Sequence, residues 1–139
     1  MTNLTQDQIE ELEDFWNDSD KVSIALVSAD ELAHIGHLFK PSPDEGGIHK
    51  PGMRKAIDSA AERRVKVLSD SIHKTLCVQW RYCERRAAFS GEGIQLCLAV
   101  ADGLLSAVTQ IPIPVTALSV YLVRRGLLDA ICQCSKSTP

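Results

Sequence analysis

Glu31, His34 and His37 have the types and spacing of possible metal ligands. Glu31 and His34 form a Glu-x-x-His pattern, which places a carboxylate and an imidazole on one face of a helix, as in di-iron bundles. Such sites use a second Glu-x-x-His, and this sequence lacks one. Acidic residues also favour the first turn of a helix without any metal. We therefore predict no metal site here.

Cysteine and histidine recur later in the chain. His73 and Cys77 are four residues apart, and Cys132 and Cys134 lie near the end, but this spacing matches no common structural zinc site. Cys77, like Cys83 and Cys97, is predicted to be a small buried apolar side chain. The polar, acidic N-terminus predicts no signal peptide. With an odd count of five cysteines, we expect a reducing, cytoplasmic location and no disulfide framework.

A third pattern resembles an acyl-serine active site. Ser71 and Lys74 are spaced as Ser-x-x-Lys, but the companion motifs of such enzymes are missing. No pair of carboxylates stands out in an apolar setting, so general acid–base catalysis has no obvious residues. We predict that the protein is not an enzyme and uses no cofactor.

Charge is unevenly distributed along the chain. Residues 1–45 hold eleven acidic residues and two lysines, a net charge of −9, whereas residues 50–86 hold ten basic and four acidic residues, a net charge of +6. We favour attraction between these two parts within the fold. The alternative is a nucleic-acid-binding protein that uses the basic face of residues 54–86. Its polyanion contacts would be Arg63, Lys66, Lys74, Arg81 and Arg85.

Capping patterns predict the N-terminal helices. Thr5 and Gln8 form a capping box that begins a first helix, which should end near residues 17–20. Residues 21–28 fit a strand or a helix, and we favour a helix because a lone strand would lack a partner. Ser28 and Glu31 form a second capping box, predicting a helix to Phe39. Residues 40–52 hold three prolines and three glycines and predict a loop.

An apolar stripe follows this loop. Its residues recur every three or four positions and include Ile57, Ala61, Val65, Leu68, Ile72, Leu76 and Trp80. A continuous helix over residues 51–89 would be about 58 Å long, whereas a domain of this length is about 37 Å across. We favour continuity over a break at residues 69–71. An overhanging stripe would then need a partner, and we predict a homodimer built on these residues.

The run from Ile94 to Val123 carries one charge, Asp102, and could lie in a membrane or form a core. Pro112 and Pro114 divide the run into two pieces, each shorter than the ~20 residues of a spanning helix. The first piece has a polar face through Gln95, Asp102 and Ser106, which favours a soluble bundle. The second is apolar on all sides, which is typical of a helix at the centre of a core. Arginine pairs at both ends keep the membrane alternative open.

Together these patterns predict an all-α single domain over residues 1–139, a small bundle of four to six helices. It would comprise acidic N-terminal helices (1–39), a Pro/Gly loop (40–52), and a long basic central helix followed by a C-terminal apolar hairpin (53–134). The predicted function is a non-catalytic interaction module, or a small subunit of a larger assembly, acting through helix–helix contacts with a protein partner or a second copy. The alternatives are nucleic-acid binding through residues 54–86 and membrane association through residues 94–123.

Overall fold

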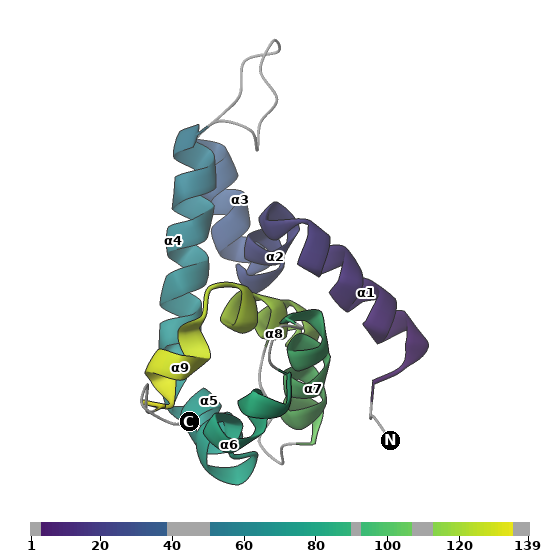
Figure 1. Ribbon diagram of the computed structural model, residues 1–139. Helices are drawn as coiled ribbons and strands as arrows, with labels where there is room; N and C mark the ends of the chain where they lie inside the picture. Colours follow the sequence, from purple (N-terminus) through teal and green to yellow (C-terminus); the bar gives the residue numbers. More distant parts are fainter. Residues whose placement is uncertain (1–3, 39–50, 90–92, 107–112, 135–139) are drawn as a thin grey trace.

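The protein is all-helical over the residues that its computed structural model describes, which are 4–38, 51–89, 93–106 and 113–134. Figure 1 shows the arrangement of the helices. Their bounds are α1 (Gln6–Asn17), α2 (Ser19–Leu26), α3 (Ala29–Leu38), α4 (Pro51–Val67), α5 (Ser69–Ile72), a π-helical segment (His73–Gln79), α6 (Tyr82–Arg85), a 3₁₀ turn (Arg86–Phe89), α7 (Gly93–Leu105), α8 (Val115–Arg124) and α9 (Leu127–Ile131). The all-α prediction is confirmed. The described residues form nine α-helices, several of them short, in place of the four to six expected.

Both predicted capping patterns begin helices. At α1 the Gln8 amide donates to Thr5 Oγ1 over 3.2 Å, and the Thr5 amide donates to Gln8 Oε1 over 2.9 Å, which completes the capping box. At α3 the Glu31 amide donates to Ser28 Oγ over 3.2 Å. The segment that fitted either a strand or a helix is helix α2, capped by Asp18. Phe39 and residues 40–50 of the predicted loop lie outside the described residues, and α4 already begins at Pro51.

The acidic N-terminal part and the basic helix attract each other within the chain, as favoured from the charge pattern. Arg54 of α4 pairs with Asp20 of α2 at 3.2 Å, and Arg63 pairs with Glu31 of α3 at 2.7 Å. Arg64 donates to the Leu26 carbonyl at the end of α2 over 3.1 Å. These contacts hold α4 along α2 and α3, with which it packs.

The prediction of a continuous helix from 51 to 89 is wrong. Helix α4 ends at Val67, the chain passes through the short α5 and the π-helical segment, and Arg81 adopts a left-handed conformation with φ 59°. Trp80 closes the π-helical segment with an i→i+5 bond to the Thr75 carbonyl. The divided helix turns back and buries most of its own stripe, because a straight helix of this length would leave that stripe in water.

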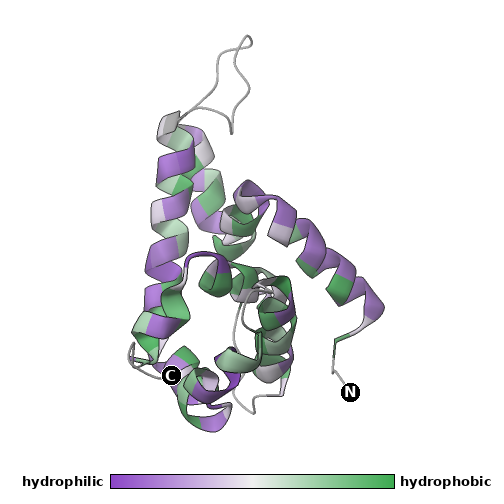
Figure 2. Ribbon diagram, in the orientation of Figure 1, coloured by the Kyte–Doolittle hydropathy of each residue, from purple (hydrophilic) through white to green (hydrophobic). Residues whose placement is uncertain are grey.

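Helix α8 occupies the centre of the fold. It packs against α1, α2, α7 and α9, and every residue from Thr116 to Leu122 is buried. Figure 2 shows the corresponding contrast between the hydrophobic α7 and α8 and the mixed surfaces of α1 and α4. Two polar side chains in this stretch are satisfied: Thr116 donates to Glu11 of α1 over 2.6 Å, and Ser119 donates to its own helix's Val115 carbonyl over 2.8 Å. The prediction that the second apolar piece is central to the core is confirmed.

Helices α7 and α8 pack against each other as the predicted apolar hairpin. The buried face of α7 is Cys97, Val100, Ala101 and Leu104. It is rotated from the apolar face that the sequence pattern places opposite Gln95 and Ser106, which consists of Ile94, Leu98, Ala101, Leu105 and Val108. Ala101 belongs to both faces, and Val108 lies outside the described residues. Gly103 explains part of this rotation, because a Cβ there would lie 2.9 Å from the Trp80 ring. The ring therefore covers α7 at a point where only glycine leaves room.

None of the helices in the described ranges has the length and apolar character needed to cross a membrane. Residues 107–112, which include Pro112 of the predicted break, lie outside those ranges. The described part of residues 94–123, the segment of the membrane alternative, therefore contains no membrane-spanning helix.

Burial of the stripe gives a direct test on stability. Ile72 has no exposed surface, whereas Val67, on the same basic segment, is 82% exposed. We expect Ile72→Ala to lower the free energy of unfolding by about 2–5 kcal/mol, because it leaves a cavity in the core. Val67→Ala is the matched control and should change it by less than about 0.5 kcal/mol. Urea unfolding followed by circular dichroism measures both, and an equal effect of the two variants would contradict the described packing.

Candidate functional site

The structure does not bring Glu31, His34 and His37, whose types and spacing suit metal ligands, together into a site. Glu31, His34 and His37 all lie on α3, but Glu31 is engaged by Arg63 at 2.7 Å. Across the described residues, no group of three or more His, Cys, Asp or Glu side chains is placed to hold a metal ion. Ser71 lies on α5 and Lys74 in the π-helical segment, and no described hydrogen bond joins them.

The expectation that the chain has no disulfides is wrong in this structure. Cys77 is bonded to Cys132, and Cys83 to Cys134, across sequence separations of 55 and 51 residues. Cys97 is the remaining cysteine and is buried, as predicted. Sequence spacing could not reveal these pairs, because each joins the segment around α6 to the end of the chain only after folding.

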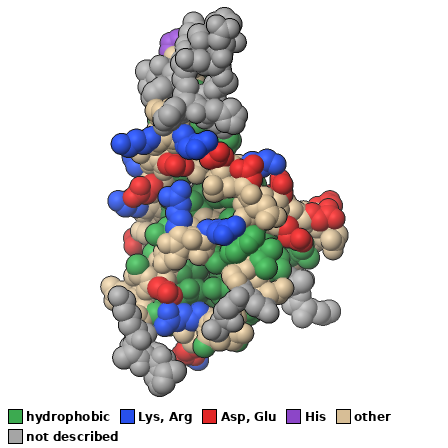
Figure 3. Space-filling view, turned by 45° about the horizontal axis from the view of Figure 1, so that its top comes forward, with side chains coloured by type: hydrophobic (Ala, Val, Ile, Leu, Met, Phe, Trp, Pro, Cys, Tyr) green, Lys and Arg blue, Asp and Glu red, His purple; other side chains and the backbone are tan. Residues whose placement is uncertain are grey.

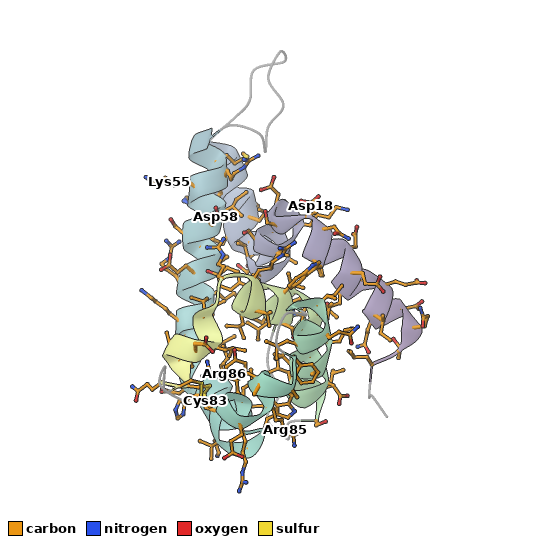
Figure 4. All side chains as sticks on the ribbon, viewed as in Figure 1. Asp18, Lys55, Asp58, Cys83, Arg85 and Arg86 are labelled. Atoms are coloured by element: carbon orange, nitrogen blue, oxygen red, sulfur yellow. A yellow bond between two sulfur atoms is a disulfide. The ribbon has the colours of Figure 1, made fainter. Side chains whose placement is uncertain are left out.

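The disulfides fix the C-terminal helix α9 against the π-helical segment and α6. Tyr82 donates to Asp129 Oδ1 of α9 over 2.9 Å, and Arg86 pairs with the same oxygen at 2.9 Å. Figure 4 shows Cys83 and Arg86 beside α9. Burial, followed by the bond to Asp129, raises the pKa of the Tyr82 phenol above its ordinary value. Tyr82 therefore stays protonated and serves as a hydrogen-bond donor.

Most residues predicted to mediate self-association are buried within the chain itself. Five of them are 5% exposed or less, namely Ile57, Ala61, Val65, Ile72 and Leu76. Leu68 and Trp80 are partly buried against the same core. The overhanging stripe that motivated a homodimer is therefore not present in the described residues.

The predicted polyanion contacts do not lie on one continuous helix. They are divided among α4, the π-helical segment, the left-handed residue after it and α6. All but Lys74 have partners within the chain: Arg63 with Glu31 at 2.7 Å, Lys66 with Glu62 at 3.8 Å, Arg81 with Glu84 at 3.7 Å, and Arg85 with the Trp80 carbonyl at 2.6 Å. Lys74 is exposed.

A hollow between α1, α2 and α8, here called the α1–α8 hollow, has a volume of about 390 Å³. Phe15 and Trp16 of α1 and Val120 of α8 contribute apolar walls, and Arg124 and Arg125 also line it. The Arg124 guanidinium lies 4.1 Å from the centroid of the Trp16 ring, and its Nη2 donates to the Trp16 carbonyl over 2.6 Å. Arg124 thus joins the end of α8 to the end of α1 by stacking and by a hydrogen bond.

A second hollow of about 270 Å³, the α4–α9 hollow, lies on the other side of Arg125. Val65 of α4 and Leu127 and Ile131 of α9 supply apolar lining. Tyr121 and Arg125 line both hollows, with the guanidinium of Arg125 4.5 Å from the centroid of the Tyr121 ring. Burial raises the pKa of the Tyr121 phenol, and the charge of Arg125 opposes that rise.

Asp58 of α4 lies beside this stack. Its Oδ1 accepts a hydrogen bond from Ser23 of α2 over 2.7 Å and is 3.8 Å from Arg125 Nη2. The distance to Arg125 exceeds hydrogen-bond length, so the principal partner of Asp58 is Ser23. The stacked arginine therefore keeps hydrogen-bonding capacity at the surface.

Sequence reasoning missed this pair of hollows. The sequence pattern places Trp16 on the apolar face of the first helix, and it indicates no role for Arg124 and Arg125 beyond flanking a membrane hairpin. The available signal was an arginine pair directly after an apolar helix that contains Tyr121. Only the packing of α1 and α2 on α8 brings Trp16 to that end of the helix.

No protein-family model matches the chain, and no curated protein or solved structure is significantly similar to it. A fold alone would not establish a function in any case. The geometry of the two hollows therefore carries the functional argument.

The cysteine pairing predicts a specific pattern of thiol reactivity. Burial raises the pKa of the Cys97 thiol to about 12, so the folded protein should not react with iodoacetamide at neutral pH. Unfolding without a reductant should expose one reactive cysteine, and unfolding with a reductant should expose five. Mass spectrometry counts the alkylated residues. Five reactive cysteines without reductant would contradict both disulfides.

Proposed function

We propose that the protein is a non-catalytic interaction module whose protein partner binds over the two hollows on either side of Arg125. The observation that carries this proposal is that one arginine–tyrosine stack lines both hollows, and that Trp16 and Arg124 form a second such stack beside it. Figure 3 shows one face of the molecule with a broad hydrophobic area into which Lys and Arg side chains are set.

The residue types support a protein partner. Tryptophan, tyrosine and arginine are the residues most enriched among the energetic centres of protein interfaces. Here the two guanidinium groups are already stacked on aromatic rings. Ordering these long side chains on binding would therefore cost less conformational entropy than ordering free ones.

The ionisable groups support a non-catalytic role. Catalytic nucleophiles and bases have pKa values shifted toward neutrality, whereas Lys21, Tyr82, Cys97 and Tyr121 all have raised pKa values. Each shift keeps the group in the protonated form that it already has at neutral pH. The causes are burial for Tyr82, Cys97 and Tyr121, and the hydrogen bond to Asp14 for Lys21. These causes are structural.

The other predicted modes of action have less support. Self-association through the stripe from Ile57 to Trp80 would require buried residues to leave the core. Nucleic-acid binding through residues 54–86 would require arginines to exchange their acidic partners for phosphates. We therefore propose that the partner binds at the hollows. A homodimer, if it forms, would use the same surface.

The disulfides also bear on where the protein works. Disulfides persist in oxidising compartments and are rare in the reducing cytoplasm. The pairs Cys77–Cys132 and Cys83–Cys134 therefore weigh against the cytoplasmic location expected from the sequence. We propose that the protein works with both disulfides formed, because Leu127 and Ile131 of the α4–α9 hollow lie on the helix that they fix.

Site-directed photocrosslinking tests the proposed contact surface. A photoreactive residue would replace Ser19, at the α1–α8 hollow, or Lys66, at the α4–α9 hollow; both are exposed. In cells that naturally contain the protein, we expect each position to give a discrete adduct with one partner protein. The control replaces Val78, which is 60% exposed and lines neither hollow. A partner captured at Val78 but at neither hollow would contradict the proposed surface.

A further inference from the structure

We propose that the α1–α8 hollow recognises a carboxylate side chain of the partner together with a large apolar side chain close to it in the partner's sequence. This inference rests on the proposed function and names the chemistry of the partner. The carboxylate binds Arg124, with Arg125 beside it, and the apolar side chain enters the space between α1, α2 and α8.

Arg124 has unused capacity for a carboxylate. A guanidinium carries five N–H donors, and the hydrogen bond described for Arg124 uses one nitrogen, Nη2, to reach the Trp16 carbonyl. Within the described ranges Arg124 has no acidic partner within 4.0 Å. The Trp16 ring, 4.1 Å from the guanidinium carbon, and the Trp16 carbonyl together hold the fork in place. A fixed, planar fork is suited to bidentate binding of a carboxylate.

The rest of the hollow favours an apolar group beside that charge. Phe15, Val22 and Val120 line it together with the Trp16 ring. Its volume of about 390 Å³ is within the range of pockets that hold a ligand group. A partner side chain that covers this apolar surface removes it from water, which stabilises the complex.

Charge around the hollow favours a single carboxylate over a polyanion. Asp18 is next in sequence to Ser19, which lines the hollow, and Asp58 lies 3.8 Å from Arg125. A chain of phosphates would meet these carboxylates and be repelled, whereas one carboxylate can be held by the arginines alone. Segments with Asp or Glu next to a large apolar residue therefore match the hollow in both charge and polarity.

A peptide-display selection tests this assignment. A library of short random peptides, fused at both ends so that it presents no free terminal carboxylate, is selected against the full chain with its disulfides intact. We expect the selected peptides to share an Asp or Glu next to a large apolar residue. Replacing the acidic residue of the peptide by Asn or Gln should weaken binding at least about tenfold, the usual effect of losing one charged hydrogen-bonded partner.

Protein variants locate the binding. Arg124→Gln should cause a similar loss, and Arg124→Lys a smaller one, because lysine keeps the charge but not the planar fork. The control is Arg81→Gln, an exposed arginine paired with Glu84, which should leave binding unchanged. Arg124 also joins α8 to α1, so each variant's unfolding midpoint is measured. The Asn and Gln substitutions within the peptide test the same contact on the unaltered protein.

Each other outcome overturns the inference. If the selected peptides need no acidic residue, or bind equally well to Arg124→Gln, the carboxylate assignment is wrong. The protein would then still be an interaction module, but its partner would have a different chemistry. Octanoate serves as a probe for small carboxylate ligands. If no peptide is selected and octanoate binds in a way that depends on Arg124, the ligand is a small carboxylate. Self-association lost in Arg124→Gln would make the occupant a second copy. Photocrosslinking at the hollows reports on the proposed function separately from all three.

Discussion

The burial of α8 is the constraint on which the rest of the structure depends. A helix with no water-facing side from Thr116 to Leu122 must be covered all round, and α1, α2, α7 and α9 supply that cover. Burial on this scale is tolerated because its Thr116 and Ser119 hydroxyls both donate hydrogen bonds. No buried side-chain nitrogen or oxygen in the described residues lacks a partner.

The surrounding helices are held by interactions of different kinds. Ion pairs such as Arg63–Glu31 join α4 to the N-terminal helices, but exposed pairs contribute little free energy each. At the other end, two disulfides and the contacts of Asp129 hold α9. The proposed binding surface follows from this arrangement. Arg124 ends α8 and Arg125 caps it; both are exposed, and they stack on the rings of Trp16 of α1 and Tyr121 of α8.

Features that depend on local interactions, such as helix starts, were predicted well from the sequence. Thr5 with Gln8 and Ser28 with Glu31 began helices where expected, and the apolar character of residues 115–123 predicted a central helix. The helix from 51 to 89 could not be predicted correctly, because its in-phase stripe is equally consistent with one straight helix and with pieces that fold back. The disulfide pairs and the hollows beside Arg125 were also beyond sequence patterns. Both depend on contacts between residues that are about fifty to a hundred positions apart.

Hydrogen exchange of individual backbone amides tests the central position of α8 most directly. If α8 is covered on all sides, its amides should exchange slowest and only through global unfolding, so their protection should equal the free energy of unfolding measured with denaturant. Amides of α4, which has an exposed face, should exchange faster, through smaller openings. Protection of α8 below that of α4, or exchange of α8 without global unfolding, would contradict the account.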